Sequence, residues 1–179
     1  MYVVKDGENM ETIYCRRSIR KYDSRKVEPE KIDKMLRAAM QAPSAGNQQP
    51  WEFLVVEDKG HLVKMSKIGP YAGMLMEAPL AIIVLGNLDN LRFPMFWEQD
   101  LGAATQNLLL QAADEGLGAV WIGVAPIKKR EEVLNDMFRL PEHVRPFCII
   151  AMGYPAKGQE NYFTDRFKKE KVHYETYQR

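Results

Sequence analysis

Basic side chains gather in the segment 16–22, RRSIRKY, which follows a short predicted helix. Arginine forms paired, charge-assisted hydrogen bonds with phosphate, and the hydroxyl of Ser18 adds a further polar contact. Taken alone, the same composition also fits a solvated basic face. The segment therefore indicates a phosphate site only in combination with other parts of the chain.

Two further segments have the composition of a ligand site. The loop 43–53, PSAGNQQPWEF, is small, rich in amides and uncharged until Glu52, so its amides could approach a planar heterocycle closely. An ordinary connection is an equally good interpretation of this loop. The segment 116–124, GLGAVWIGV, carries glycines at both ends of a predicted strand, where they permit a ligand to approach the backbone.

Groups for acid–base, nucleophilic or metal chemistry are missing. The 3 histidines, His61, His143 and His173, show no metal-ligand spacing. The sequence contains no nucleophile elbow, no P-loop and no dinucleotide-binding glycine motif after a strand. We therefore expect neither a catalytic side chain nor a metal, and an enzyme of this kind needs a cofactor that carries the reactivity.

Length and composition favour one domain spanning residues 1–179, with 46% hydrophobic and 27% charged residues. The formal net charge of +1 selects neither nucleic acid nor a membrane surface. Cys15 and Cys148 form no C-x-x-C pair, the first ten residues do not resemble a secretory signal, and the longest apolar run, 78–86, is too short to span a bilayer. These features predict a cytoplasmic protein without nucleic-acid or membrane partners.

Hydrophobic periodicity predicts helices and strands in mixed order, with Asn9 as the N-cap of the first helix. The predicted helices cover about 10–15, 29–42, 61–68, 97–115 and 127–138. The predicted strands cover 53–56, 80–85, 119–124 and 147–152. The helix 97–115 is apolar on more than one face, and the aromatic tail 156–179 lacks periodicity, so both could be covered by a partner subunit.

Together, in this order, the segments 16–20, 43–51 and 118–123 resemble the nitroreductase-like family of FMN oxidoreductases, in its short single-domain branch. The resemblance extends from about Cys15 to Phe167 and includes the segment 100–107, DLGAATQN. It implies an α+β fold with a central, mostly antiparallel sheet flanked by helices, in an intertwined homodimer. It also implies an FMN-dependent NAD(P)H oxidoreductase that reduces nitroaromatics, quinones or similar small planar acceptors by ping-pong hydride transfer.

The resemblance also implies roles for individual residues. Arg16, Arg17 and Ser18 match residues that hold the FMN phosphate and ribityl chain, and Arg166 resembles a C-terminal arginine on the phosphate. Arg20 matches a basic residue near the flavin N1 and O2.

Two other parts of the chain match the ring-binding positions of the family. A pair whose backbone lies against the ring near N5 is matched by Ile122 and Gly123. A loop that reaches the flavin from the other subunit is matched by Pro43, Ser44, Ala45 and Asn47. Larger family members carry an acidic residue at the position of Ile122, so only a backbone role is expected there, and no side chain in 64–76 matches the family's further ring-facing polar residue.

Three alternatives accompany this interpretation. A flavin enzyme of the same fold could catalyse dehalogenation or flavin fragmentation instead, with a different lid. The basic segment 16–26 could belong to a non-enzymatic anion or nucleic-acid binder, although the near-zero net charge and the lack of a nucleic-acid motif argue against it. The aromatic residues Phe93, Phe96 and Trp97 could form a lid or could equally serve in packing.

Overall fold

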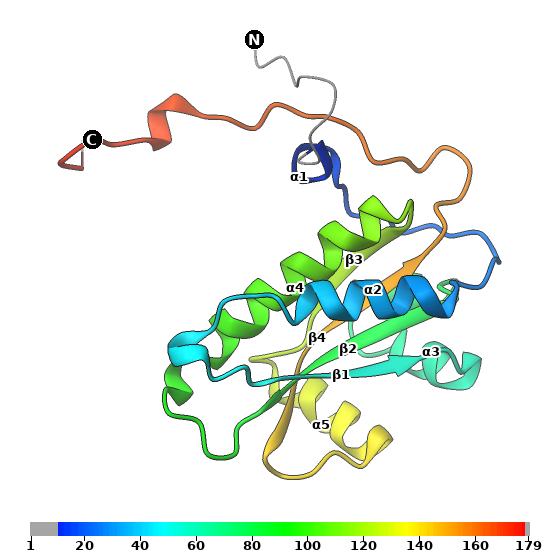
Figure 1. Cartoon of the computed structure of the whole chain (residues 1–179). Helices are drawn as coiled ribbons and strands as arrows, with labels where there is room; N and C mark the ends of the chain where they lie inside the picture. Colours follow the sequence, from blue (N-terminus) through cyan, green and yellow to red (C-terminus); the bar gives the residue numbers. More distant parts are fainter. Residues whose placement is uncertain (1–10, 178–179) are drawn as a thin grey trace.

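A four-stranded antiparallel sheet, in the order β1-β2-β4-β3, forms the centre of the computed structural model, which describes residues 11–177 (Figure 1). The strands are β1 (Trp51–Val56), β2 (Leu80–Asn87), β3 (Gly118–Gly123) and β4 (Val144–Gly153). All three strand pairs are antiparallel. The sheet with its flanking helices confirms the predicted α+β class.

Helices cover both faces of this sheet (Figure 1). They are α1 (Glu11–Cys15), α2 (Pro29–Ala39), α3 (Lys59–Met65), α4 (Trp97–Asp114) and α5 (Lys128–Phe138). Residues of α2 and α4 pack with Leu80, Ile82 and Val84 of β2, whereas residues of α3 and α5 pack with the intervening Ala81 and Ile83. Because side chains alternate along a strand, the continuous apolar run of β2 supplies two cores.

Most predicted boundaries lie within a few residues of the observed ones, and the differences have local causes. Helix α2 ends at Ala39 rather than 42. Pro43 disfavours helical geometry at the residue before it, and a turn takes the place of the last predicted helical residues. Strand β4 begins at Val144 despite Pro146, which lies opposite Leu85 at a bulge and beyond the last residue paired with β3. The predicted cap Asn9 lies outside the described residues.

Helix α4 keeps apolar surface that residues 11–177 do not fully cover. Leu101, Ala104, Leu108 and Ala112 are fully buried, as their spacing predicts. Ala103, Leu110 and Ala113, which point in other directions, remain half-buried. Among residues 11–177 no helix is long and apolar enough to cross a membrane.

The C-terminal segment runs as an extended arm away from the sheet (Figure 1). Its aromatic side chains are largely exposed, with Phe167 at 74%, Tyr174 at 78% and Tyr177 at 79% of their full accessible area. Exposed aromatic rings are costly in water, so this arm has the composition of a segment that packs on another surface.

Candidate functional site

The basic segment 16–20 lies along the outer edge of β3. Ser18 forms a parallel bridge with Ala119, and the N–H of Ile19 donates to the carbonyl of Ala119 at 3.1 Å. The side chain of Ile19 is buried, and a Cβ on Gly118 would lie 2.6 Å from its Cβ. The glycine at the start of β3 is therefore required for this segment to dock.

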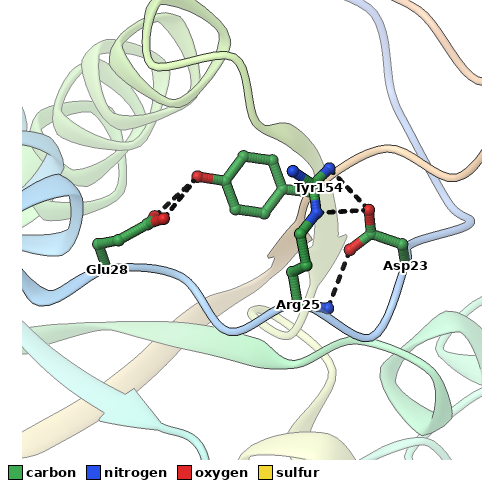
Figure 2. A network of polar contacts seen from close by, with 4 residues as sticks. All are labelled: Asp23, Arg25, Glu28 and Tyr154. Atoms are coloured by element: carbon green, nitrogen blue, oxygen red, sulfur yellow. Dashed lines mark hydrogen bonds and ion pairs between the residues drawn. The ribbon is translucent and has the colours of Figure 1, made fainter.

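A second set of contacts fastens the chain between this segment and α2 (Figure 2). The hydroxyl of Tyr154 lies 2.7 and 3.0 Å from the two carboxylate oxygens of Glu28, to which it donates. The guanidinium of Arg25 lies over the Tyr154 ring, 3.9 Å from its centroid, and is paired with Asp23. The hydrogen bond from Tyr154 lowers the pKa of the Glu28 carboxyl below its usual value. These contacts hold residues 23–28 against the end of β4.

One end of the candidate site is a cavity of about 430 Å³ lined by Arg17, Ser18, Arg20 and Arg166, together with residues 158–160 and Tyr162. Burial, with the charges of Arg17 and Arg166, lowers the pKa of Arg16. Positive charge is thus concentrated here. Glu160 is an acidic residue that borders this cavity, but within residues 11–177 it forms no ion pair with these arginines.

Arg17 holds this end of the site together and keeps one donor free. Its Nη1 donates to the carbonyl of Arg16 at 2.6 Å, and its backbone N–H donates to the Asn161 side chain at 2.8 Å. The central carbon of its guanidinium lies 4.7 Å from the centroid of the Tyr162 ring. Its Nε is buried and has no partner in the described part of the chain. Clustered guanidiniums and an unpaired buried donor suit an anion such as a phosphate.

The other end is a cavity of about 460 Å³ lined by Arg20, Arg130, residues 68–74 and residues 120–123. Arg20 lines both cavities, so the two ends adjoin one another. A Cβ placed on Gly123 would meet no heavy atom within 4 Å, so open space lies beside the end of β3. This cavity can accept a flat group along the strand.

The backbone of β3 offers hydrogen-bonding groups toward this cavity. The carbonyl of Ala119 points to the outer edge, where Ile19 bonds it, and the direction alternates along an antiparallel strand. The backbone N–H and C=O groups of Trp121 and Gly123 therefore also point outward. The carbonyl of Gly123 accepts a hydrogen bond there from Arg130. Within residues 11–177, the N–H groups of Trp121 and Gly123 have no hydrogen-bond partner.

The predicted amide loop is not brought into either cavity of its own chain. Asp100, buried in the first turn of α4, accepts the N–H of Ala45 at 2.9 Å and the amide of Gln48 at 2.6 Å. Asn47 has φ 56° and Gln49 φ 48°, in the left-handed region that such residues rarely adopt. Pro43, Ser44, Ala45 and Asn47 line neither cavity. Within residues 11–177, this loop has a fixed conformation but borders neither of the two cavities of its own chain.

The structure also locates Ile122, Gly123 and Trp97, for which the sequence predicted or allowed a role at the site. Ile122 and Gly123 line the cavity at the end of β3, and the Ile122 side chain is buried in the core, which leaves its backbone as the accessible part. Trp97 is buried against Phe147, which favours packing over a lid for that residue. No cluster of three or more metal-ligating side chains occurs in the described structure.

Sequence reasoning missed two side chains of the site. Arg130 belongs to the charged run KKREE, 128–132, which has the pattern of a solvated helix face. Tyr162 lies in the aperiodic tail. No local signal marks either residue, because each reaches the site only through the folding of distant elements.

Comparison with known proteins gives a consistent result. The model of the nitroreductase family matches residues 13–76 and 69–154. A relative from Methanothermobacter thermautotrophicus, named "Putative NADH dehydrogenase/NAD(P)H nitroreductase", is 47% identical over 93% of this chain and 86% of its own.

Two solved structures share the fold. The crystal structure of a "Putative NADH Oxidase" from Clostridium acetobutylicum is 52% identical, with a TM-score of 0.90 over 93% of this chain and 99% of that one. A "putative nitroreductase in complex with fmn" from Desulfovibrio desulfuricans is 30% identical, with a TM-score of 0.82 over 96% and 100% of the two chains. With a family model that covers most of the chain and relatives this similar, the chain belongs to the nitroreductase family.

Proposed function

We propose that this protein is an FMN-dependent NAD(P)H oxidoreductase that reduces small planar acceptors such as nitroaromatics and quinones, as a homodimer. One observation carries the proposal: an arginine-rich cavity and an open strand edge adjoin at Arg20. A phosphate group and a flat ring on one molecule need these two surfaces side by side. The FMN-bound relative from Desulfovibrio desulfuricans supports the same assignment.

The phosphate end is assigned to Arg16, Arg17, Ser18 and Arg166. Burial, followed by the charges of Arg17 and Arg166, lowers the pKa of Arg16, and a dianionic phosphate relieves the repulsion among these arginines. The unpaired Nε of Arg17 gains a partner when an anion binds. Because the guanidinium of Arg17 donates to two backbone carbonyls and lies over the Tyr162 ring, it is held in place before the ligand arrives.

The ring end is assigned to the outer edge of β3 and to Arg20. The outward N–H groups of Trp121 and Gly123 can donate to a planar heterocycle, and Arg20 places a positive charge beside it. FMN, when bound, supplies hydride acceptance and donation at its N5. The chain contributes orientation and charge.

Among the described residues, no Asp, Glu or His side chain lines the cavity at the ring end. An acceptor there meets apolar and aromatic side chains, backbone and the guanidiniums of Arg20 and Arg130, and no carboxylic acid or imidazole. Stacking discriminates weakly among flat molecules, so we propose a broad range of acceptors and an exchange of donor and acceptor at one open face.

We base the homodimer on three surfaces that residues 11–177 of one chain leave exposed or half-buried. They are the loop 43–47, the half-buried face of α4 and the exposed aromatic arm. We propose that Pro43, Ser44, Ala45 and Asn47 complete the site of the second subunit.

The test is an absorbance spectrum followed by anaerobic titration. The purified protein, after incubation with FMN, should hold close to one FMN per chain and lose the oxidised flavin absorbance on addition of NADH or NADPH. Failure to bind FMN at micromolar concentration contradicts the proposal. Tight FMN binding without reduction by either nicotinamide would favour the non-reductive flavin chemistry that the same fold could support.

A further inference from the structure

A second guanidinium faces the ring end of the site, from an element that the family motifs do not include. Arg130 stands in the first turn of α5 and lines the same cavity as Arg20. Its Nη1 donates to the carbonyl of Gly123 at 2.7 Å. This bond ties the side chain to the open end of β3 and fixes the position of its charge.

A glycine makes room for this side chain. A Cβ on Gly69 would lie 2.7 Å from Nη2 of Arg130, 3.0 Å from Cζ and 3.1 Å from Nε. The guanidinium therefore lies directly on the backbone of the turn 68–72, and any larger residue at position 69 would displace it. Two elements far apart in sequence are fitted to each other at this point.

The charge of Arg130 is not neutralised by the protein. The adjacent Glu131 is buried and paired with Arg145 at 3.0 Å, whereas Arg130 forms no ion pair within residues 11–177. Among the described residues, no acidic residue lines the cavity, and Arg20 is the other charged residue there. Within this part of the chain, the cavity thus holds two positive charges without an acidic partner.

We propose that Arg130 is a second cationic residue of the ring site, which acts with Arg20 to favour the reduced, negatively charged state of the flavin. The inference depends on the proposed function, because it requires FMN in this cavity. A cation beside a flat ring stabilises whichever redox state carries more negative charge, and the low polarity of the surrounding residues 68–74 and 120–123 strengthens that effect.

The experiment measures the midpoint potential of bound FMN in purified holoprotein. Arg130→Gln should lower the equilibrium constant for two-electron reduction about tenfold, or roughly 30 mV toward more negative potential. Arg130→Lys should shift the potential less than Arg130→Gln, because it keeps the charge. Lys129→Gln, a neighbouring exposed lysine outside the cavity, removes the same charge and should leave the potential unchanged.

Gly69→Ala provides an independent test, since it leaves every charge in place and displaces the guanidinium. The potential should move in the same direction as in Arg130→Gln. This variant, with Arg130→Lys, also decides the matter if Arg130→Gln does not fold or does not retain FMN.

The outcomes separate this inference from the proposed function. A wild-type protein that binds no FMN contradicts the proposed function. If the wild type binds FMN and the potentials of the Arg130 and Gly69 variants equal its own, Arg130 has no electrostatic role and the inference is overturned. An equal shift in Lys129→Gln would also overturn it, because net charge alone would then explain the effect.

Discussion

The side chain of Ile19 lies directly on the backbone of Gly118, so closely that a Cβ on the glycine would be 2.6 Å from the Cβ of Ile19. At the other end of the same strand, a Cβ on Gly123 would meet nothing within 4 Å. One glycine of β3 accommodates the protein itself, and the other borders empty space in the cavity.

Alanine substitutions should therefore separate folding from binding. Gly118→Ala overpacks the contact with Ile19 and should reduce the free energy of unfolding by about 1–3 kcal/mol. Gly123→Ala should change it by less than about 0.5 kcal/mol but weaken FMN binding. Urea unfolding of the apoprotein and FMN titration measure the two effects. A Gly123→Ala protein that binds FMN like the wild type would show that the ring does not lie against this end of β3.

The phosphate assignment can be tested with two flavins. Arg166→Ala removes a charge-assisted contact, typically about 1.5–3 kcal/mol, and should weaken FMN roughly ten- to hundredfold. Riboflavin lacks the phosphate and should bind this variant as it binds the wild type. Fluorescence titration with each flavin gives both constants, and Lys168→Ala, an exposed neighbour outside the cavity, is the control. Equal weakening of the two flavins would remove Arg166 from the phosphate.

Mixed dimers can show whether the loop 43–47 acts on the partner. Arg166→Ala weakens the arginine-rich cavity and Asn47→Ala weakens the loop, so each homodimer should bind FMN weakly. In a mixed dimer with the loop acting across the interface, one site carries both defects and the other carries none. Titration should then recover one tight site per dimer. If the loop served its own chain, each site would carry one defect and no tight site would appear.

The open face that donor and acceptor share at the ring end predicts the kinetic pattern. Initial rates against NADH at several fixed quinone concentrations should give parallel double-reciprocal lines, because donor and acceptor use one face in turn. Nitroaromatic acceptors should behave in the same way. Intersecting lines would require a ternary complex and a second binding pocket near the ring.

The hydrogen bond between Tyr154 and Glu28 predicts a pH dependence of stability. The folded-state pKa of Glu28 is lowered, chiefly by this bond, so its contribution is present above the ordinary glutamate pKa of about 4.3 and is lost as pH falls through the folded value. Glu28→Gln should therefore be less stable than the wild type at pH 7, and the difference should shrink below about pH 4.

Thermal unfolding at several pH values measures this difference. Glu30→Gln is the matched control, because Glu30 lies two residues away in the first turn of α2 and its side chain forms no hydrogen bond or ion pair within residues 11–177. A difference between wild type and Glu28→Gln that stays constant with pH would show that the carboxylate charge is not involved.

The sequence predicted the elements well wherever a pattern was continuous. The run 80–85 marked β2, and the spacing of Leu101, Ala104, Leu108 and Ala112 marked the buried face of α4. It placed the start of α3 too late, because the N-cap Asp58, which accepts from the N–H of His61, was not recognised. Ends of elements depend on single side-chain contacts, and these carry little periodic signal.

The candidate site was predictable where its residues are contiguous. Arg16, Arg17, Ser18 and Arg20 form one segment, and the structure places three of them around one cavity with Arg166. Arg130 could not be predicted, because its role requires a glycine in the turn after α3 and a carbonyl at the end of β3. Such a juxtaposition exists only in the folded chain.

The open edge of β3 has a consequence for the behaviour of the protein without its ligand. Unpaired N–H and C=O groups on an edge strand are a template onto which another chain can add, and proteins commonly shield such edges. Residues 18–19 shield the first half of the outer side of β3, but from Trp121 to Gly123 this outer side pairs with no strand within residues 11–177. A ring bound there would act as a shield as well as a reagent. The solubility of the protein in a cell would then depend on flavin supply, with cofactor-starved chains the first to aggregate.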